Sequence, residues 1–285
     1  MKDWANLDEF IQSALREDIG NGDITANACL DPLRISKAYA ITRDAGIIAG
    51  LELARKIFNA HNPSIKFTTE LNDGARVQPG NVLFEVEGPQ TDLLSAERVV
   101  LNCMQRMSGI ATLTHQVQSM IAHTNCKVLD TRKTTPNFRI PEKWAVEIGG
   151  GVNHRMGLYD MILIKDNHID YCGSVDTAIK KSLEYLSKNS LDIPIVVETR
   201  DLDEVDACLI FANKLERILL DNMSSKEILH AVQHIQGRIP TEASGGITLK
   251  NVKEYAETGV DFISMGSIVY DAHLLDMSMK SYRQI

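Results

Sequence analysis

Hydrophobic and polar positions divide the chain into two parts with different patterns. In the first part, apolar residues at helical spacing alternate with short runs rich in β-forming residues. The elements expected from this pattern are helices over 7–17 and 51–60, strands over 38–48, 65–71 and 82–86, and a helical stretch over 92–122. Ser108-Gly109 predicts a break in the last stretch. The first part is therefore expected to be an α+β unit.

The second part repeats in architecture. After residue 122, six short runs of apolar or small residues recur, at 127–130, 161–164, 193–197, 217–220, 239–243 and 261–265. Most are separated by expected helices, two of which begin with the spacing of a capping box, Asp201 with Glu204 and Ser224 with Glu227. Alternating strands and helices imply a parallel sheet, and about six to eight such units usually close into an α/β barrel.

Polar residues follow directly after these strands, and a barrel would bring them to one mouth. In chain order they are Arg132 and Lys133; Lys165, Asp166 and His168; Glu198; Asp221; Ser244, Gly245 and Gly246; and Ser264, Gly266 and Ser267. Cations come from the early strands, carboxylates from the middle strands and glycine turns from the last two. Glycine and serine loops after late strands bind phosphate in many barrels, because their backbone N–H groups can surround an anion.

The stretch 128–168 concentrates cationic groups in a chain whose formal net charge is −8. They include Arg132, Lys133, Arg139, His154, Arg155, Lys165 and His168. Three successive glycines, 149–151, let the backbone approach a ligand or turn sharply. Against a solvated basic loop, this clustering around two strand ends favours a pocket for an anionic ligand.

Glu198 and Asp221 follow adjacent strands and suit Mg²⁺, directly or through water, since that ion keeps several waters and takes one or two carboxylates plus ligand phosphates. The alternative is a pair of structural carboxylates that balance Lys133 and Lys165. The two roles are compatible. Arg98 sits beside Glu97 in an apolar helical stretch, and spacing alone favours a surface ion pair for it.

Composition excludes several classes of protein. Hydrophobic residues make up 44% and charged residues 24% of the 285 positions, which are ordinary globular values. An acidic balance argues against a nucleic-acid binder. The amphipathic, acidic N-terminus lacks the apolar region of a signal peptide, and no apolar run approaches the roughly 18–20 residues of a membrane span. Five widely spaced cysteines are interpreted as reduced thiols of a cytoplasmic protein.

Taken together, the motifs resemble one family, the carboxylating nicotinate-nucleotide pyrophosphorylases, also called quinolinate phosphoribosyltransferases. The resemblance runs nearly end to end through ALREDIGNGDIT, ERVVLNCMQRMSGIAT, LDTRKTTP, GGGVNHRMGLYDMILIKDNH, VVETRDLDE, ILLDNM and EASGGI. It implies an α/β fold with an N-terminal α/β sandwich domain and an incomplete TIM-like α/β barrel. The domains would be 1–113 joined by the C-terminal segment 270–285, and the barrel 114–269. It also implies a homodimer or larger assembly, in which each barrel mouth faces a neighbouring N-terminal domain.

The resemblance further implies a reaction. Quinolinate and phosphoribosyl pyrophosphate would give nicotinate mononucleotide, pyrophosphate and CO₂, with Mg²⁺ as cofactor. Quinolinate would be held by Arg132, His154, Arg155 and Lys165, with Arg98 donated by the partner chain. Lys133, Glu198 and Asp221 would serve the phosphoribosyl and Mg²⁺–pyrophosphate end, and Lys165 with these three is expected to be catalytic. The remaining substrate-binding positions are Thr131 and the 5′-phosphate loops at Ser244, Gly245, Gly246, Met265, Gly266 and Ser267.

The chain departs from the family pattern at two places, and three rival functions stay open. Asn137-Phe138 replace a common glycine and leucine, and residues 268–271 replace the usual small and hydroxyl residues. A paralogous family associated with molybdate transport is one rival. A phosphosugar aldolase or isomerase with Lys165 as Schiff-base amine is another. The last is a non-enzymatic anion-binding barrel. The proton donor after decarboxylation, Lys165 or His154, is not ranked by the sequence.

Overall fold

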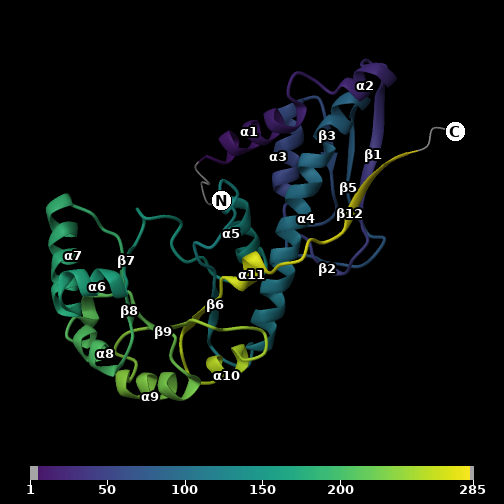
Figure 1. The fold of residues 1–285 in the computed structure, drawn as a ribbon. Coiled ribbons are helices and arrows are strands. Elements are labelled where there is room, and N and C mark those ends of the chain that lie inside the picture. Colours follow the sequence, from purple (N-terminus) through teal and green to yellow (C-terminus); the bar gives the residue numbers. More distant parts are fainter. Residues whose placement is uncertain (1–5, 283–285) are drawn as a thin grey trace. The chain divides into compact units, whose positions relative to one another are not determined.

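The computed structural model describes residues 6–282, which form two compact units (Figure 1). The described parts of the first unit are 6–115, 134–150 and 268–282, and the second unit comprises 116–133 and 151–267. These units differ from the expected domains by two residues at 114–115 and at 268–269, and by a longer segment in between. Residues 134–150, which were expected in the barrel domain, belong to the first unit. Among the described residues, none of the helices has both the length and the apolar character that a membrane span requires.

The first unit is built on an antiparallel sheet in the order β12-β1-β5-β3, with a separate β2-β4 pair. Its elements are α1 (Leu7–Ile19), α2 (Ile24–Cys29), β1 (Ile35–Thr42), β2 (Gly46–Ile47), α3 (Leu51–His61), β3 (Lys66–Thr68), β4 (Arg76–Val77), β5 (Val82–Pro89), α4 (Gln90–Met120), α5 (Arg139–Ile148), α11 (Ser267–Tyr270) and β12 (Met277–Ser281). The last residues of α4 and the first of α11 belong to the second unit. Because β12 pairs with β1, the C-terminal segment completes the N-terminal sheet.

Helix α4 is continuous, so the break expected at Ser108-Gly109 is wrong. Both residues serve packing instead of a turn. Ser108 Oγ accepts from the Ala49 backbone N–H over 2.9 Å and donates to the Ala49 carbonyl over 3.1 Å. A Cβ on Gly109 would lie 1.9 Å from the carbonyl oxygen of His273. A glycine within a helix can therefore mark a close backbone approach as well as a helix end.

Helix α5 belongs to the first unit because of a buried carboxylate. Glu142 is fully buried, and its Oε1 accepts from Arg106 Nε over 3.0 Å. The same carboxylate accepts from the Thr135 backbone N–H and hydroxyl, over 2.8 and 2.9 Å. The spacing of apolar residues gave no sign of this connection between α5 and α4.

The second unit is a six-stranded parallel sheet in the order β6-β11-β10-β9-β8-β7, with helices on its outer side (Figure 1). Its elements are β6 (Lys127–Leu129), β7 (Ile162–Ile164), α6 (Asp166–Cys172), α7 (Val175–Asn189), β8 (Ile195–Thr199), α8 (Leu202–Leu209), η1 (Ala212–Lys214), β9 (Arg217–Asp221), α9 (Ser225–Ile235), β10 (Thr241–Ser244), α10 (Val252–Ala256) and β11 (Phe262–Ser264). Each of the six expected runs overlaps one of these strands. The expected fold class, an α/β protein with an N-terminal sheet domain and an incomplete barrel, is confirmed.

The barrel is incomplete because β6 and β7, the two edge strands of this sheet, do not pair with each other. Beside β6, only a single bridge from Leu129 to Val152 continues the pairing among the described residues.

Two helices of the second unit begin at the residues that the sequence predicts. Ser224 and Glu227 form the expected capping box of α9. Asp201 caps α8, but the carboxylate of Glu204 accepts from the backbone N–H of Arg200 instead of closing the box.

Candidate active site

Parallel pairing brings those expected site residues that stand at strand ends to one edge of the sheet of the second unit, the edge where the carboxyl ends of its strands meet. Ile164 pairs with Val197, so Lys165 and Glu198 follow at the same level of β7 and β8. Farther along the sheet, Asp221 is the register partner of Ser244. Since the carboxyl ends of parallel strands meet at one edge, functional groups from separate strands lie within reach of one ligand.

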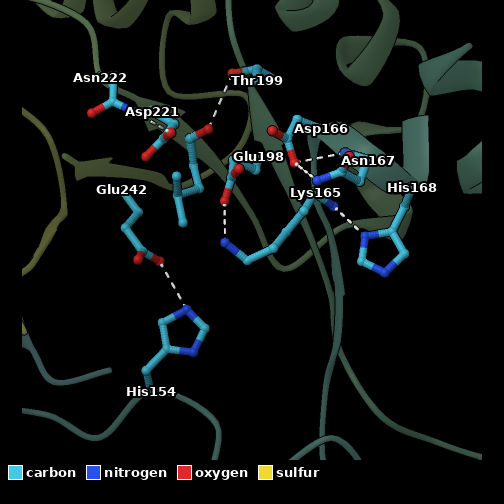
Figure 2. A network of polar contacts seen from close by, with 11 residues as sticks. His154, Lys165, Asp166, Asn167, His168, Glu198, Thr199, Asp221, Asn222 and Glu242 are labelled. Carbon is cyan, nitrogen blue, oxygen red and sulfur yellow. Dashed lines mark hydrogen bonds and ion pairs between the residues drawn. The ribbon is translucent and has the colours of Figure 1, made fainter. Parts of the chain in front are cut away.

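Lys165 and Glu198 form the central ion pair of this edge (Figure 2). Lys165 Nζ lies 2.8 Å from Glu198 Oε2, and the side chains are 47% and 8% exposed. The carboxylate is thus fixed in the protein while the ammonium group faces solvent. The backbone N–H of Lys165 donates to His168 Nδ1 over 3.0 Å, which holds the turn into α6.

Asp221 ends β9, and its carboxyl group is surrounded by polar groups. Burial raises the pKa of Asp221 above its usual range, and Lys165 together with hydrogen bonds from Ser244 and Asn222 opposes this shift. Asn222 Nδ2 donates to Asp221 Oδ2 over 2.6 Å. Asp166 adds a further negative charge that raises the pKa. A cation bound here would favour the ionised carboxylate.

The two glycines of the turn after β10 have different surroundings. Gly245 and Gly246 have φ angles of 95° and 63°, a region that favours glycine. A Cβ on Gly245 would lie 2.2 Å from Asn222 Oδ1, whereas a Cβ on Gly246 would meet nothing within 4 Å. Gly245 is therefore needed for packing, and Gly246 presents bare backbone to open space.

The turn after β11 is the neighbour of the β10 turn on the side away from β9. Met265 is buried, and its backbone N–H donates to the Leu129 carbonyl over 3.0 Å. Gly266 and Ser267 follow and are half-buried. The expected 5′-phosphate positions therefore lie at the ends of two adjacent strands.

Two arginines of the basic stretch lie close enough to repel each other. Arg155 is only 9% exposed, and its Nη1 donates to the Met161 carbonyl over 3.2 Å. Burial lowers the pKa of the Arg155 guanidinium, the charge of Arg132 lowers it further, and Asp160 opposes both. Concentrated positive charge with little access to water is the electrostatic signature of an anion site.

His154 has both ring nitrogens engaged within the protein. Its Nδ1 accepts from the Arg155 backbone N–H over 2.8 Å, and its Nε2 lies 3.5 Å from Glu242 Oε2 (Figure 2). The His154 backbone N–H donates to Asp130 Oδ1 over 2.8 Å. The ring therefore faces the sheet interior, at the level of β10.

The remaining expected residues are placed less tightly. Lys133 is exposed, and its backbone N–H donates to Thr131 Oγ1 over 3.0 Å, which shapes the turn after β6. Arg132 is also exposed. Arg98 lies on an exposed position of α4 in the first unit, whereas the other expected site residues belong to the second unit.

Sequence reasoning missed three residues of this edge and of the sheet interior below it. Glu242 and Arg217 form a buried ion pair, and Asn222 adopts a left-handed conformation with φ 55°. A signal for the first two was present, because each is a charged residue within one of the expected strand runs. The conformation of Asn222 had only the weak signal that asparagine tolerates positive φ.

Two family models match the chain and together cover most of it. The C-terminal domain of quinolinate phosphoribosyl transferase matches residues 110–280, and the N-terminal domain of the same family matches residues 23–108.

Named relatives match over nearly the whole of this chain. The decarboxylating quinolinate phosphoribosyltransferase 2 of Nicotiana glauca, named mitochondrial, is 45% identical over 96% of this chain and 82% of its own. A probable carboxylating nicotinate-nucleotide pyrophosphorylase of Bacillus subtilis is 38% identical over 96% and 92%. Among solved structures, nicotinate-nucleotide pyrophosphorylase from Francisella tularensis has a TM-score of 0.90 at 36% identity, covering 99% of this chain and 98% of that one.

Proposed function

Because the chain belongs to the quinolinate phosphoribosyltransferase family, we propose that it transfers the phosphoribosyl group of phosphoribosyl pyrophosphate to quinolinate with decarboxylation. The products are nicotinate mononucleotide, pyrophosphate and CO₂, a step of de novo NAD biosynthesis. The structural observation that best supports this reaction is the nearly buried guanidinium of Arg155, which bonds to the Met161 carbonyl and whose pKa is lowered by burial and by the charge of Arg132.

Quinolinate carries two adjacent carboxylates, and arginine offers planar, bidentate and permanently charged donors for them. Binding the dianion would relieve the repulsion between Arg132 and Arg155. Lys165 adds a third cation at the solvent-facing side of its ion pair. With both carboxylates fixed, the ring nitrogen is aimed at the anomeric carbon, so positioning supplies much of the rate.

The bond changes place opposite charges at the two ends of the site. The ring nitrogen bonds to the anomeric carbon as the bond from that carbon to pyrophosphate breaks, and the leaving group takes the electron pair. Lys133 is the exposed cation that would stabilise this developing negative charge. Loss of CO₂ then leaves a carbanion beside the ring N⁺, and a proton must reach that carbon.

The phosphoribosyl 5′-phosphate is assigned to the two turns after β10 and β11. Gly246 is exposed, and space for a ligand lies in front of its Cα. The positions in this proposal are Ser244, Gly245, Gly246, Met265, Gly266 and Ser267. Backbone N–H groups in such glycine turns bind phosphate without a side chain.

Mg²⁺ would be held jointly by carboxylates at this edge and by phosphate groups of the substrate. Within residues 6–282, no group of three or more His, Cys, Asp and Glu side chains is arranged to hold a metal ion. Glu198 and Asp221 would hold it directly or through water, with phosphate oxygens as further ligands, which is the usual environment of Mg²⁺. When bound, the ion neutralises charge on the pyrophosphate group.

We also propose a homodimer in which Arg98 completes the partner's site. Arg98 is exposed on α4, and Leu94, one turn earlier, is 48% exposed. An apolar residue next to an exposed arginine suits a protein interface. Mixing inactive Arg98→Ala and Lys165→Ala chains should restore roughly a quarter of the wild-type activity, because random C₂ dimers then contain one intact site in half of the molecules. No restored activity after subunit exchange would rule out a shared site.

A cytoplasmic location is proposed on the basis of the five free cysteines. Relatives from Nicotiana glauca and Arabidopsis thaliana carry mitochondrial and chloroplastic names. Cell fractionation with an antibody against the chain tests the location.

The reaction is tested with quinolinate, phosphoribosyl pyrophosphate and Mg²⁺, with nicotinate replacing quinolinate in a parallel assay. Nicotinate mononucleotide formed only from quinolinate would support the assignment and the need for both carboxylates. Absence of product with folded, dimeric protein would refute it. Borohydride trapping with carbonyl substrates separates the aldolase rival, since a phosphoribosyltransferase should form no covalent adduct at Lys165.

A further inference from the structure

A cluster of buried polar side chains lies inside the parallel sheet, apart from the expected substrate residues. Arg217 on β9, Glu242 on β10 and Ser264 on β11 are 6%, 0% and 7% exposed. Arg217 Nε lies 2.6 Å from Glu242 Oε2, and its guanidinium carbon lies 5.0 Å from the ring centre of Phe262. Buried charges are costly, so such a cluster needs a structural or functional reason.

The cluster connects to the active site through His154, which is itself 8% exposed. His154 Nδ1 accepts a hydrogen bond from the Arg155 backbone N–H over 2.8 Å, so this nitrogen carries no proton. In the neutral ring the proton is then on Nε2, which lies 3.5 Å from Glu242 Oε2 (Figure 2). The assignment of the tautomer follows from the hydrogen-bond partners.

The Glu242 carboxylate carries the negative charge of the cluster. Burial by itself raises the pKa of Glu242, but His154, Arg217 and Ser264 outweigh it, and the net pKa lies below its usual value. Glu242 is therefore ionised, and Arg217 supplies the matching positive charge. The pair needs no positive charge on His154.

We propose that Glu242 is a positioning residue that holds His154 as the Nε2–H tautomer, and that His154 in turn fixes the backbone at Arg155. The chain of contacts runs from the Glu242 carboxylate through both nitrogens of one imidazole to the amide of the arginine that is assigned to quinolinate. Its catalytic consequence rests on the proposed function. The same geometry assigns the proton donor, because His154 offers no ring proton to the ligand and Lys165 is the remaining candidate of the two.

The first test needs no substrate. In ¹⁵N-histidine-labelled wild-type protein at neutral pH, His154 should show a bare Nδ1 and a protonated Nε2, with its signals assigned by their loss in His154→Gln. In Glu242→Gln the carboxylate, which can only accept, is replaced by an amide that can present either its oxygen or its NH₂ group to Nε2, so the signals should move toward a mixture of tautomers. An Nδ1–H ring or a doubly protonated ring in the wild type, or unchanged signals in Glu242→Gln, would overturn the proposal whatever the reaction is.

The second test uses the transferase assay. Glu242→Gln should raise KM for quinolinate about tenfold, the loss that one hydrogen bond to a charged group represents, with KM for phosphoribosyl pyrophosphate nearly unchanged. Asp261→Asn is the matched control in the same sheet, because Asp261 accepts from Thr241 and has no contact with the cluster. Equal increases of both KM values in Glu242→Gln, or the same effect in Asp261→Asn, would contradict positioning through His154.

Folding failure is covered by a further variant. Glu242→Gln leaves Arg217 buried with its charge uncompensated, whereas Glu242→Gln with Arg217→Met removes both charges. The double variant should fold and show the same mixture of tautomers. A folded double variant with the wild-type tautomer would show that Glu242 does not position His154.

Discussion

Gly245 and Gly246 allow the packing of the active-site turn to be separated from its ligand contacts. Both have positive φ, 95° and 63°, so an alanine at either position is strained by about 1–2 kcal/mol. At Gly245 the added Cβ would also lie 2.2 Å from Asn222 Oδ1 and 2.8 Å from its backbone nitrogen. Overpacking of this kind costs about 1–3 kcal/mol. Gly245→Ala should therefore lower stability by about 3 kcal/mol in total, and Gly246→Ala by about 1 kcal/mol.

Thermal and urea unfolding of the two variants give the comparison. For a unit of this size, a loss of 3 kcal/mol corresponds to a fall in Tm of about 6–12 °C, and a loss of 1 kcal/mol to about 2–4 °C. In the transferase assay of folded protein, Gly246→Ala should be the more damaging of the two variants. Gly246→Ala points a methyl group into the proposed 5′-phosphate position and should raise KM for phosphoribosyl pyrophosphate more than KM for quinolinate.

A double-mutant cycle tests the stated contact. Asn222→Gly removes the side-chain atoms that clash with the new Cβ but leaves the backbone nitrogen at 2.8 Å, so it should restore part of the stability of Gly245→Ala. Equal losses in Gly245→Ala and Gly246→Ala would refute the steric reasoning. So would additive effects of Gly245→Ala and Asn222→Gly.

Three further predictions concern charges. Glu142→Gln should lower the free energy of unfolding by about 3 kcal/mol in urea titrations, because it breaks a buried ion pair with Arg106; the exposed Asp176–Lys180 pair serves as control, and Asp176→Asn should cost under about 0.5 kcal/mol. Burial raises the pKa of Asp221, so the folded state binds this proton more tightly than the unfolded chain does. The contribution of Asp221 to the free energy of unfolding therefore falls as the pH rises above the ordinary pKa of an aspartate. Asp221→Asn should remove this part of the pH dependence and lower kcat at least about a hundredfold. Arg155→Met should raise the Tm of the ligand-free protein and abolish the increase in Tm that quinolinate gives to the wild type; a lower Tm in this variant would contradict repulsion between Arg155 and Arg132.

The period of the apolar residues was enough to predict the parallel sheet, since each of the six runs overlaps a strand and Ser224 caps its helix as expected. The same pattern gave wrong predictions where packing between residues far apart in the sequence determines the structure. Ser108-Gly109 has the composition of a break, yet the bonds from Ser108 to Ala49 and the close approach of His273 keep α4 continuous. Residues 134–150 belong to the first unit through Glu142, whose partner Arg106 is far away in the sequence.

The candidate site was predictable to the extent that its residues follow strands. Lys165, Glu198 and Asp221 were identified by that rule, and parallel register places them at one edge. Contacts between side chains carry no such rule. That His154 would turn toward Glu242, and that Asn222 would support Asp221, depends on rotamers and a left-handed backbone that the residue pattern does not determine.

Two arginines of the second unit show how one residue type serves stability and ligand binding. Arg217 and Arg155 are almost equally buried, at 6% and 9% exposure. Arg217 pairs with Glu242 at 2.6 Å and stacks on Phe262, so its charge is compensated within the protein. The guanidinium of Arg155 bonds to a carbonyl, and its pKa is lowered by burial and by Arg132. Asp160 opposes this shift only in part. Under the proposed function, the dianionic substrate would supply the remaining compensation at Arg155 and would thereby gain differential affinity for the folded site.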